Sequence, residues 1–405
     1  MRAKSNQKLI KQINLVKVFQ AIREQGPISR AEIAKNHRLS PTTVSSLTEE
    51  LIAMGLVETT GIGESSGGRR PVMLKYKPNS RFTIGVDIND KNIAVGCCNL
   101  NGQVIEKITF SPDYSNAKNL IAGAIYGIQQ ILSKVDPDPS RLLGIGIAIP
   151  GLLDKKRTSL IYSASLALKD VPLLAGLQQQ LNYPISIEND MNAAAFGEHL
   201  LGSGRNADNL IYISVARGIG AGVIIDGKIF PGGSGNAGEL GHMGIDPNGP
   251  LCECGNKGCL GVMATEPAFL SKAVHMLSLS IPTKLKSLTH NNLSNVSLAV
   301  IKQAIDEEDP VALKILEENM NYLGMGIANL FAIFDPSLII LGGEVIDFLG
   351  EPALDAVRKS VGKYTILPDY YGKNVRIVPG SLGEDAMIIG AASLIFSKFL
   401  DTLQA

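Results

Sequence analysis

The chain has 405 residues, 45% of them hydrophobic, and its 38 Lys+Arg balance 38 Asp+Glu to a formal net charge of zero. With 42 Gly and 20 Pro the composition is that of a globular protein, which excludes a disordered or fibrous chain and allows two or three domains. The charge is nevertheless divided unevenly. Residues 1–80 hold 13 basic and 6 acidic side chains, a net of +7, and the remaining 325 residues carry −7. This asymmetry predicts a basic module joined to an acidic body.

The N-terminus is charged throughout and lacks the apolar stretch and cleavage site of a signal peptide. No run of about 18 uncharged apolar residues occurs, so we expect neither a transmembrane span nor a membrane partner. Five cysteines are present, three of them within eight residues. This clustering favours a metal site over a disulfide framework, and we expect a cytoplasmic protein.

Residues 1–77 are predicted to form a winged helix-turn-helix. Helical periodicity opens the chain and ends at Gly26. Ser29 is expected to cap a second, short helix. Ser40 is expected to cap a third, with Pro41 at its first position, where a missing N–H has no consequence.

The third helix has the pattern of a recognition helix. Val44, Leu47 and Leu51 recur at spacings of three and four and predict its inward face. Polar side chains on the other face lie near the helix N-terminus, where a recognition helix meets base edges and phosphates. The residues that we expect to contact DNA there are Ser40, Thr42, Thr43, Ser45 and Ser46.

Two strands, 56–61 and 70–76, are expected to form the wing around a glycine-rich tip. Arg69 and Arg70 stand at the end of this tip, and an arginine tip suits the concentrated negative potential of a minor groove. Helix-turn-helix patterns also occur in winged helices that bind proteins. The basic wing and the charge of +7 favour double-stranded DNA as the partner.

The acidic body has the pattern of two α/β units. Residues 82–110 alternate apolar and turn residues as a three-stranded meander, and a helix (117–134) and an apolar strand (142–151) follow. A strand, a glycine loop and a second strand recur at 210–230, and a strand followed by a helix at 337–345. Two such units in tandem predict a duplicated fold with a ligand cleft between its lobes.

The predicted domain boundaries follow from these units. The first α/β lobe is expected at 78–190, with the C-terminal helix 383–405 packing back onto it. The second lobe is expected at 191–382, with a mostly helical elaboration over residues 267–320.

Four segments resemble those of a known family. They are GNAGELGHMGIDPNGPLCECGNKGCLG, IENDMNAAAFGE, ILGGEV and GEDAMIIGAA. Together with the leading winged helix they resemble the ROK family, which joins sugar kinases to sugar-responsive repressors of the xylose-repressor and glucose-repressor type. The resemblance covers nearly the whole chain. It implies an α/β fold class: a winged helix-turn-helix followed by a two-lobed actin-like, or hexokinase-like (ribonuclease H-like), ATPase-type fold.

One imidazole and three potential thiolates suggest a metal site. His242, Cys252, Cys254 and Cys259 suit four-coordinate, tetrahedral Zn²⁺, and four protein ligands leave no open position, so a structural role is expected. The alternative is a loop with free thiols. The family resemblance implies the same ligand set, with the metal shaping an adjacent sugar pocket.

A sugar needs paired hydrogen-bond donors and acceptors, and Asn189, Asp190 and Glu239 supply them. From the residues alone, Glu188 and Asp190 could equally lie in a solvated loop. The resemblance implies that Asp190 matches the general base of the kinases and that Asn189, Glu239 and His242 hold other sugar hydroxyls.

Two positions depart from the family pattern in this pocket. Gly261 stands where the family usually has a sugar-contacting glutamate, and Ser165 where it usually has an asparagine. Both changes replace a longer polar side chain by a shorter one or by none. The identity of the sugar effector therefore stays open, and a phosphorylated or unusual sugar is possible.

The nucleotide loops also depart from the kinase pattern. A kinase needs glycine-rich turns whose amides approach the phosphates. Here Asn89 and Lys91 replace the glycine and threonine of the first turn, and Arg217 replaces the small threonine of the second. We therefore expect no kinase activity and no catalytic residue, with Asp190 acting as a sugar ligand.

The leading prediction is a DNA-binding transcriptional repressor, a homodimer or tetramer, whose operator affinity is set by a small sugar between the lobes. Two alternatives stay open: a sugar kinase with a regulatory winged helix, and a repressor released from DNA by a protein partner.

Overall fold

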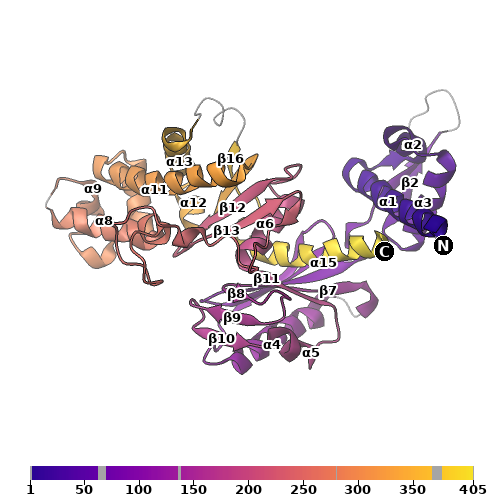
Figure 1. Cartoon of the computed structure of the whole chain (residues 1–405), viewed down its shortest axis with the longest axis horizontal. Coiled ribbons are helices and arrows are strands. Elements are labelled where there is room, and N and C mark those ends of the chain that lie inside the picture. Colours follow the sequence, from indigo (N-terminus) through magenta and orange to yellow (C-terminus); the bar gives the residue numbers. More distant parts are fainter. Residues whose placement is uncertain (1, 63–69, 136–137, 280, 367–375, 405) are drawn as a thin grey trace.

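The computed structural model describes residues 2–62, 70–135, 138–279, 281–366 and 376–404. Three parts follow one another along the chain: a small N-terminal head and two α/β lobes, with the last helix running between the lobes to the head (Figure 1). The predicted fold class, a winged helix-turn-helix followed by an actin-like two-lobed body, is confirmed by this arrangement.

The head contains three helices and a three-stranded sheet of order β1-β3-β2. Its elements are α1 (Arg2–Gln25), β1 (Ile28–Ser29), α2 (Arg30–His37), α3 (Pro41–Ala53), β2 (Val57–Ile62) and β3 (Val72–Tyr76). Ser29 caps α2 in a reciprocal capping box with Glu32, and the Ser40 hydroxyl accepts the Thr43 N–H at the start of α3. These local contacts fix the helix starts that the sequence predicts.

The first lobe is a five-stranded sheet of order β11-β7-β4-β5-β6. Its strands are β4 (Phe82–Ile88), β5 (Ile93–Asn99), β6 (Val104–Phe110), β7 (Leu142–Ile149) and β11 (Ile185–Asn189). The first three form the expected antiparallel meander, and β7 and β11 add in parallel. Helix α4 (Ala117–Val135) covers one face of this sheet and α15 (Ala386–Gln404) the other.

The second lobe repeats this topology. Its strands are β12 (Leu210–Val215), β13 (Ile219–Ile225), β14 (Lys228–Ile229), β15 (Leu338–Gly342) and β16 (Arg376–Pro379). Their order, β14-β13-β12-β15-β16, is that of the first sheet when each sheet's strands are numbered along the chain. The duplication inferred from two strand-and-glycine units is therefore visible in the strand order. Helix α6 (Asp190–Leu201) packs on β12 and β13.

A helical layer covers the other face of the second sheet and forms a large apolar core with it. Its helices are α7 (Leu260–Met263), α8 (Glu266–Ser278), α9 (Lys284–Leu288), α10 (Leu298–Asp306), α11 (Pro310–Phe334), α12 (Glu344–Leu349) and α13 (Glu351–Tyr364). The remaining elements are the small sheet β8 (Leu152–Leu153), β9 (Leu160–Ser163) and β10 (Leu168–Val171), helix α5 (Leu173–Gln178), and 3-10 turns η1 (Pro78–Ser80), η2 (Pro139–Arg141), η3 (Leu240–His242), η4 (Leu293–Asn295) and η5 (Gly383–Asp385).

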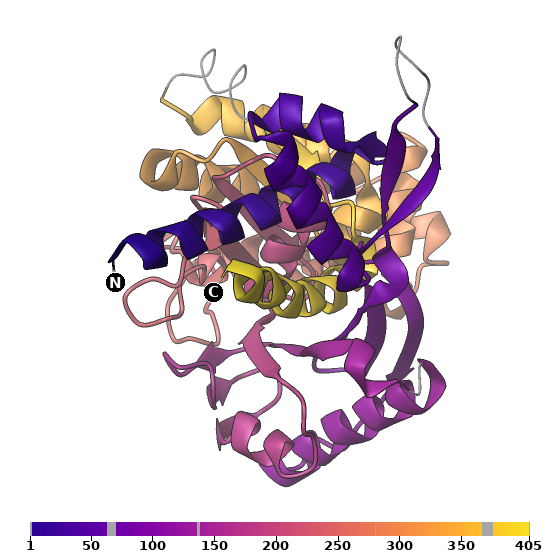
Figure 2. The ribbon, with the colours of Figure 1, turned by 90° about the vertical axis from the view of Figure 1, so that its right-hand side faces the viewer.

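Helix α15 lies at the centre of the molecule. It packs on β4, β7 and α6, and its last turns reach α1 of the head (Figure 2). Two glycines allow this close packing: a Cβ at Gly146 would lie 1.8 Å from the Ala391 carbonyl oxygen, and one at Gly390 would lie 1.9 Å from that of Ala193. Residues 383–403 have the length and apolarity of a membrane span, but half of that window is buried, as in a core helix.

Candidate effector cleft, metal cluster and DNA-binding surface

The candidate sugar ligands lie at the carboxyl edge of the first sheet. Strands β4, β7 and β11 run parallel, so their carboxyl ends share one edge, which is where ligands bind in open α/β sheets. Asn189 ends β11, Asp190 begins α6, and Asp87 stands near the end of β4. The edge thus brings together Asp190, which the sequence analysis selected, and Asp87, which it did not. The signal that could have found Asp87 is its place at the end of a buried strand beside two parallel neighbours.

The pKa values of Asp190 and Asp87 are both raised above the usual value of an aspartate. Burial raises the pKa of Asp190 to about 7, with further upward contributions from the charges of Asp87 and Glu239. Burial also raises the pKa of Asp87 to about 6, against the lowering effects of an Asn89 hydrogen bond and the Lys107 charge. Part of the surface of each residue stays open. Such carboxyl groups can accept a hydrogen bond from a ligand hydroxyl or, when protonated, donate one.

Asn189 has a structural task besides any ligand contact. Its side-chain oxygen accepts the N–H groups of Met191 (2.9 Å) and Asn192 (3.3 Å), which caps α6, and its amide nitrogen donates to the Gly151 carbonyl (3.3 Å). Among the described residues the amide therefore has one N–H left for a ligand. The cap fixes the place of Asp190, the first residue of the helix.

Glu239 and His242 come from the second lobe. Glu239 precedes η3, is exposed, and lies near enough to Asp190 for its charge to raise the pKa of that carboxyl. His242 ends η3 and belongs to the cysteine cluster. The structure therefore brings Glu239 near the Asn189–Asp190 turn, with the cysteine cluster beginning three residues beyond Glu239.

The four predicted metal ligands lie together. One donor atom from each of His242, Cys252, Cys254 and Cys259 lies within 4.8 Å of all the others. The Cys254 and Cys259 sulfurs are 3.6 Å apart, and the Cys252 sulfur is 3.7 Å from His242 Nδ1. A disulfide would need about 2.05 Å, whereas a tetrahedral ion with metal–sulfur bonds of about 2.3 Å has sulfur–sulfur edges of about 3.8 Å. The cluster can hold a tetrahedral metal ion.

The loop around the cluster depends on glycine. Gly258 has φ +62°, and a Cβ there would lie 1.6 Å from the Asp246 carbonyl oxygen, so no other residue fits. A backbone hydrogen bond from Asn256 holds the pKa of Cys254 below its usual value. This shift favours the Cys254 thiolate, the form that binds metal, whereas burial raises the pKa of Cys259 and favours its thiol when no metal is bound.

The turns that would approach nucleotide phosphates are occupied by the protein itself. Asn89 Oδ1 accepts the N–H groups of Lys91 and Asn92, each at 3.0 Å. In the second turn, Arg217 forms a 3.6 Å ion pair with Asp90 of the first turn. Two amides of the first turn thus bond to a protein side chain, and Arg217 of the second turn pairs with a carboxylate of the first.

The predicted DNA contacts of α3 lie on its outer face. Ser40, Thr42 and Ser46 are exposed, and Thr43 and Ser45 are partly exposed. The Ser40 hydroxyl also hydrogen-bonds those of Thr42 (2.9 Å) and Thr43 (2.8 Å), so this end of the helix is ordered before any ligand arrives.

At the wing, Arg70 is exposed, and Arg69 lies outside the described residues. Helix α3 also carries Thr48, which is fully buried and accepts a hydrogen bond of 2.8 Å from Arg30 Nε. Thr48 therefore fixes α2 against α3 instead of facing DNA.

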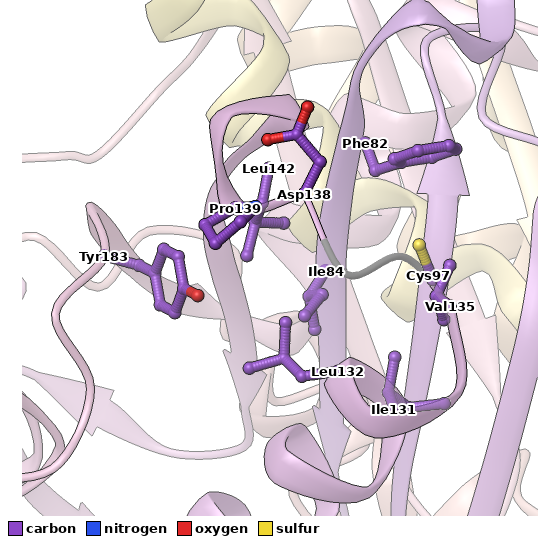
Figure 3. Close-up of a pocket in the computed structure, with 10 residues that line it drawn as sticks. All are labelled: Phe82, Ile84, Cys97, Ile131, Leu132, Val135, Asp138, Pro139, Leu142 and Tyr183. Carbon is purple, nitrogen blue, oxygen red and sulfur yellow. The ribbon is translucent and has the colours of Figure 1, made fainter.

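A separate apolar hollow of about 210 Å³ lies between α4 and the first sheet (Figure 3). Phe82, Ile84 and Cys97 line it from the sheet, while Asp138 and Tyr183 bring polar groups to it. None of the predicted sugar, metal or DNA ligands is among its lining residues, so this hollow is not the predicted sugar site.

The fold and the cluster define the class: a winged helix carried by an actin-like body of the sugar-kinase type. The chain belongs to the ROK family, whose sequence profile matches residues 83–398. The xylose repressor of Caldicellulosiruptor bescii is 34% identical over 396 residues, which cover 98% of each chain.

Solved structures agree with this assignment. A crystal structure of a ROK family transcriptional regulator, a homologue of the E. coli MLC protein, covers 98% of both chains with 27% identity and a TM-score of 0.81. A ROK family glucokinase from Streptomyces griseus, in complex with glucose and AMPPNP, covers 77% of this chain and 98% of its own, with 31% identity and a TM-score of 0.68. The chain thus matches a regulator over nearly its full length and a kinase over most of it.

Proposed function

We propose that this protein is a sugar-responsive, DNA-binding transcriptional regulator, a repressor of carbohydrate-utilisation genes in the cytoplasm. The observation that carries the proposal is the path of α15. This helix lies against α6, whose first residue is Asp190 in the effector cleft, and its Phe396 is buried in the core of the DNA-binding head. One helix therefore joins the segment that carries the proposed sugar ligand Asp190 to the winged helix.

In the proposed mechanism, the functional parts are the winged helix of residues 1–77, a first lobe of 78–190 completed by α15, and a second lobe of 191–382. A sugar held by Asn189, Asp190, Glu239 and His242 changes the closure of the lobes, and α15 carries that change to α1. A homodimer places two α3 helices in successive major grooves, so closure alters the spacing of the helices. The sugar works as a switch only through different affinities for the two states.

The two phosphate turns argue against a kinase. Phosphoryl transfer needs free backbone amides and positive charge around the phosphates. Here the Asn89 side chain accepts hydrogen bonds from two backbone amides of the first turn. Asp90 adds a negative charge beside Arg217. We therefore assign Asp190 the role of a sugar ligand and not of a working base.

The effector is a small sugar, and two positions of the proposed site that depart from the family pattern bear on which sugar it is. Ser165 lies in an exposed turn and hydrogen-bonds Ser163 (3.2 Å), and Gly261 offers no side chain beside η3. A Cβ at Gly261 would already be 3.1 Å from the Gly241 carbonyl oxygen. Gly261 thus brings no polar group, and the Ser165 hydroxyl is engaged with Ser163, so the polar recognition falls on the Asn189–Asp190 turn and on Glu239.

The test starts from full-length protein and a random pool of DNA duplexes. Selection is expected to yield a pseudo-palindromic site, and gel shifts with D-xylose, D-glucose and N-acetylglucosamine should find a sugar that changes affinity at least about tenfold, a coupling of about 1.4 kcal/mol. Failure to select any specific duplex would contradict the proposal. Sustained ADP release in a coupled phosphorylation assay with the same sugars would instead establish the kinase.

Arg70→Ala is expected to weaken operator binding several-fold and to lower its salt dependence, because a wing arginine that neutralises a phosphate releases counterions. Fluorescence anisotropy at three salt concentrations measures both quantities. Lys302→Ala, which removes a positive charge from α10 far from the head, is the matched control. An unaltered salt slope in Arg70→Ala would remove this arginine from the interface.

The metal is proposed to be structural Zn²⁺ bound by His242, Cys252, Cys254 and Cys259. The double change Cys254→Ser and Cys259→Ser should abolish bound zinc, because a hydroxyl is a poor replacement for a thiolate ligand. Elemental analysis of the purified protein measures the zinc content, with Cys97→Ala as a control that removes a thiol outside the cluster. Zinc at wild-type content in the double variant would refute the ligand assignment.

A further inference from the structure

The connection between the head and the first lobe is held firmly by the lobe. It consists of η1 (Pro78–Ser80), and the guanidinium of Arg141, the last residue of η2, donates to two of its carbonyl oxygens. The Leu100 N–H donates to the first carbonyl of the turn (3.0 Å), and Asn99 Nδ2 donates to Asn79 Oδ1 (2.7 Å). A segment with its backbone bound in this way is not a free hinge.

The recognition helix ends close to this connection. Gly55, in a left-handed conformation of φ +73°, follows the last turn of α3, and the Leu56 N–H bonds back to the Leu51 carbonyl (3.0 Å). This is the Schellman arrangement, which satisfies carbonyls inside the last turn. The carbonyl of Met54, the C-cap of α3, accepts a hydrogen bond of 2.9 Å from Arg81 Nη2.

Arg81 therefore joins two structural units with one side chain. Its Nη1 donates to the Ser80 carbonyl (2.9 Å), and its Nη2 donates to the Met54 carbonyl at the end of α3. A lysine ammonium could replace this rigid, two-pronged guanidinium only in part. A cation at a helix C-terminus also gains from the helix dipole. The same junction has an apolar side, where Leu100 of the first lobe and Phe396 of α15 are buried with Phe19 in the head core.

We propose that Arg81 is a positioning residue for DNA binding: it fixes the angle of α3 to the first lobe, so that the head and this lobe move as one body. The inference rests on the proposed function. Because the connection does not bend, a sugar can move the recognition helix only by shifting this whole body against the second lobe. A head on a flexible tether would instead absorb the motion of the lobes and lose the signal.

The first test needs neither DNA nor sugar. Hydrogen exchange followed by mass spectrometry compares the wild type with Arg81→Met, Arg81→Lys and the control Lys77→Met, whose ammonium pairs with Glu58 inside the head and does not touch α3. Arg81→Met should exchange at least about fivefold faster in peptides covering 50–57 and 77–82, and Lys77→Met should match the wild type. Wild-type exchange in Arg81→Met would overturn the proposal.

The second test uses the selected duplex. Arg81→Met should bind it about tenfold more weakly with an unchanged salt slope, because this arginine holds carbonyls and not phosphates, and Arg81→Lys should recover part of the loss. Undiminished affinity in Arg81→Met would overturn the positioning role. So would a salt dependence of binding that is weaker by the amount expected for one lost phosphate contact. If the wild type binds no duplex, the proposed function fails, and the exchange experiment alone decides on Arg81.

Discussion

Replacing Asp190 by asparagine is expected to stabilise the sugar-free protein at pH 8 and, at the same time, to abolish the response of DNA binding to the sugar. Burial and two neighbouring carboxylates raise the pKa of Asp190 to about 7 from a usual value of 3.8, so ionising this group in the folded state costs free energy. Asparagine keeps the acceptor for the backbone and removes the charge. A gain on the order of 2 kcal/mol, discounted because Asp190 is partly open to the cleft, corresponds to a few degrees in Tm.

The pH dependence of this gain follows from the direction of the shift. Between about pH 4 and pH 7 the folded protein binds more protons at Asp190 than the unfolded chain does, so the contribution of this residue to stability falls as the pH rises. The advantage of Asp190→Asn should therefore be largest above pH 7 and disappear towards pH 4. Thermal melts from pH 5 to 8, with the exposed Asp208→Asn as control, measure it. A loss of Tm at pH 8, or a retained sugar response, would contradict the assignment.

Glu198→Ala is expected to destabilise the protein by about 3 kcal/mol, because three backbone N–H groups lose the buried carboxylate that they share as acceptor. Glu198 is fully buried at the end of α6, and its carboxylate accepts the N–H groups of Ser203 (2.7 Å), Ser381 (2.8 Å) and Leu382 (2.9 Å). These partners lie on the two segments that enter and leave the second lobe. One carboxylate thus holds both crossings between the lobes.

Scanning calorimetry on the full chain measures the effect, and two variants make it specific. Glu198→Gln keeps the oxygen that serves residues 381 and 382 but places an N–H₂ group opposite the Ser203 N–H, so about half of the loss is expected. Glu58→Ala removes an exposed carboxylate of the head and should change little. A Glu198→Ala protein with the melting profile of the wild type would show that the crossings do not depend on this carboxylate.

Local chemistry made much of the fold predictable. Ser29 and Ser40 cap their helices through bonds to residues only three positions away, and Pro41 begins α3 as its missing N–H allows. The meander of the first sheet and the cysteine cluster were likewise visible as short patterns. Strand β1, by contrast, has two residues and exists only because it pairs with β3 more than forty positions later, so no period could indicate it.

The features that sequence reasoning missed depend on contacts between distant segments. Asp87 belongs to the candidate cleft because three strands end at one sheet edge, and Arg81 reaches a carbonyl 27 positions earlier in the chain. Asn189 was expected only to bind sugar, and its role as a helix cap appears once α6 begins at Asp190. Residue type predicted what these side chains can do, and the tertiary fold decides which partners they find.

The central position of α15 has a consequence for protein synthesis. Its last turns supply Phe396 to the core of the head, whose other residues leave the ribosome hundreds of codons earlier. Domains usually fold in the order in which they are made, but here the N-terminal winged helix completes its packing only after α15 has been made. A chain that still lacks α15 accordingly carries a recognition helix on an incomplete core, and we expect it to bind DNA more weakly than a chain that contains this helix.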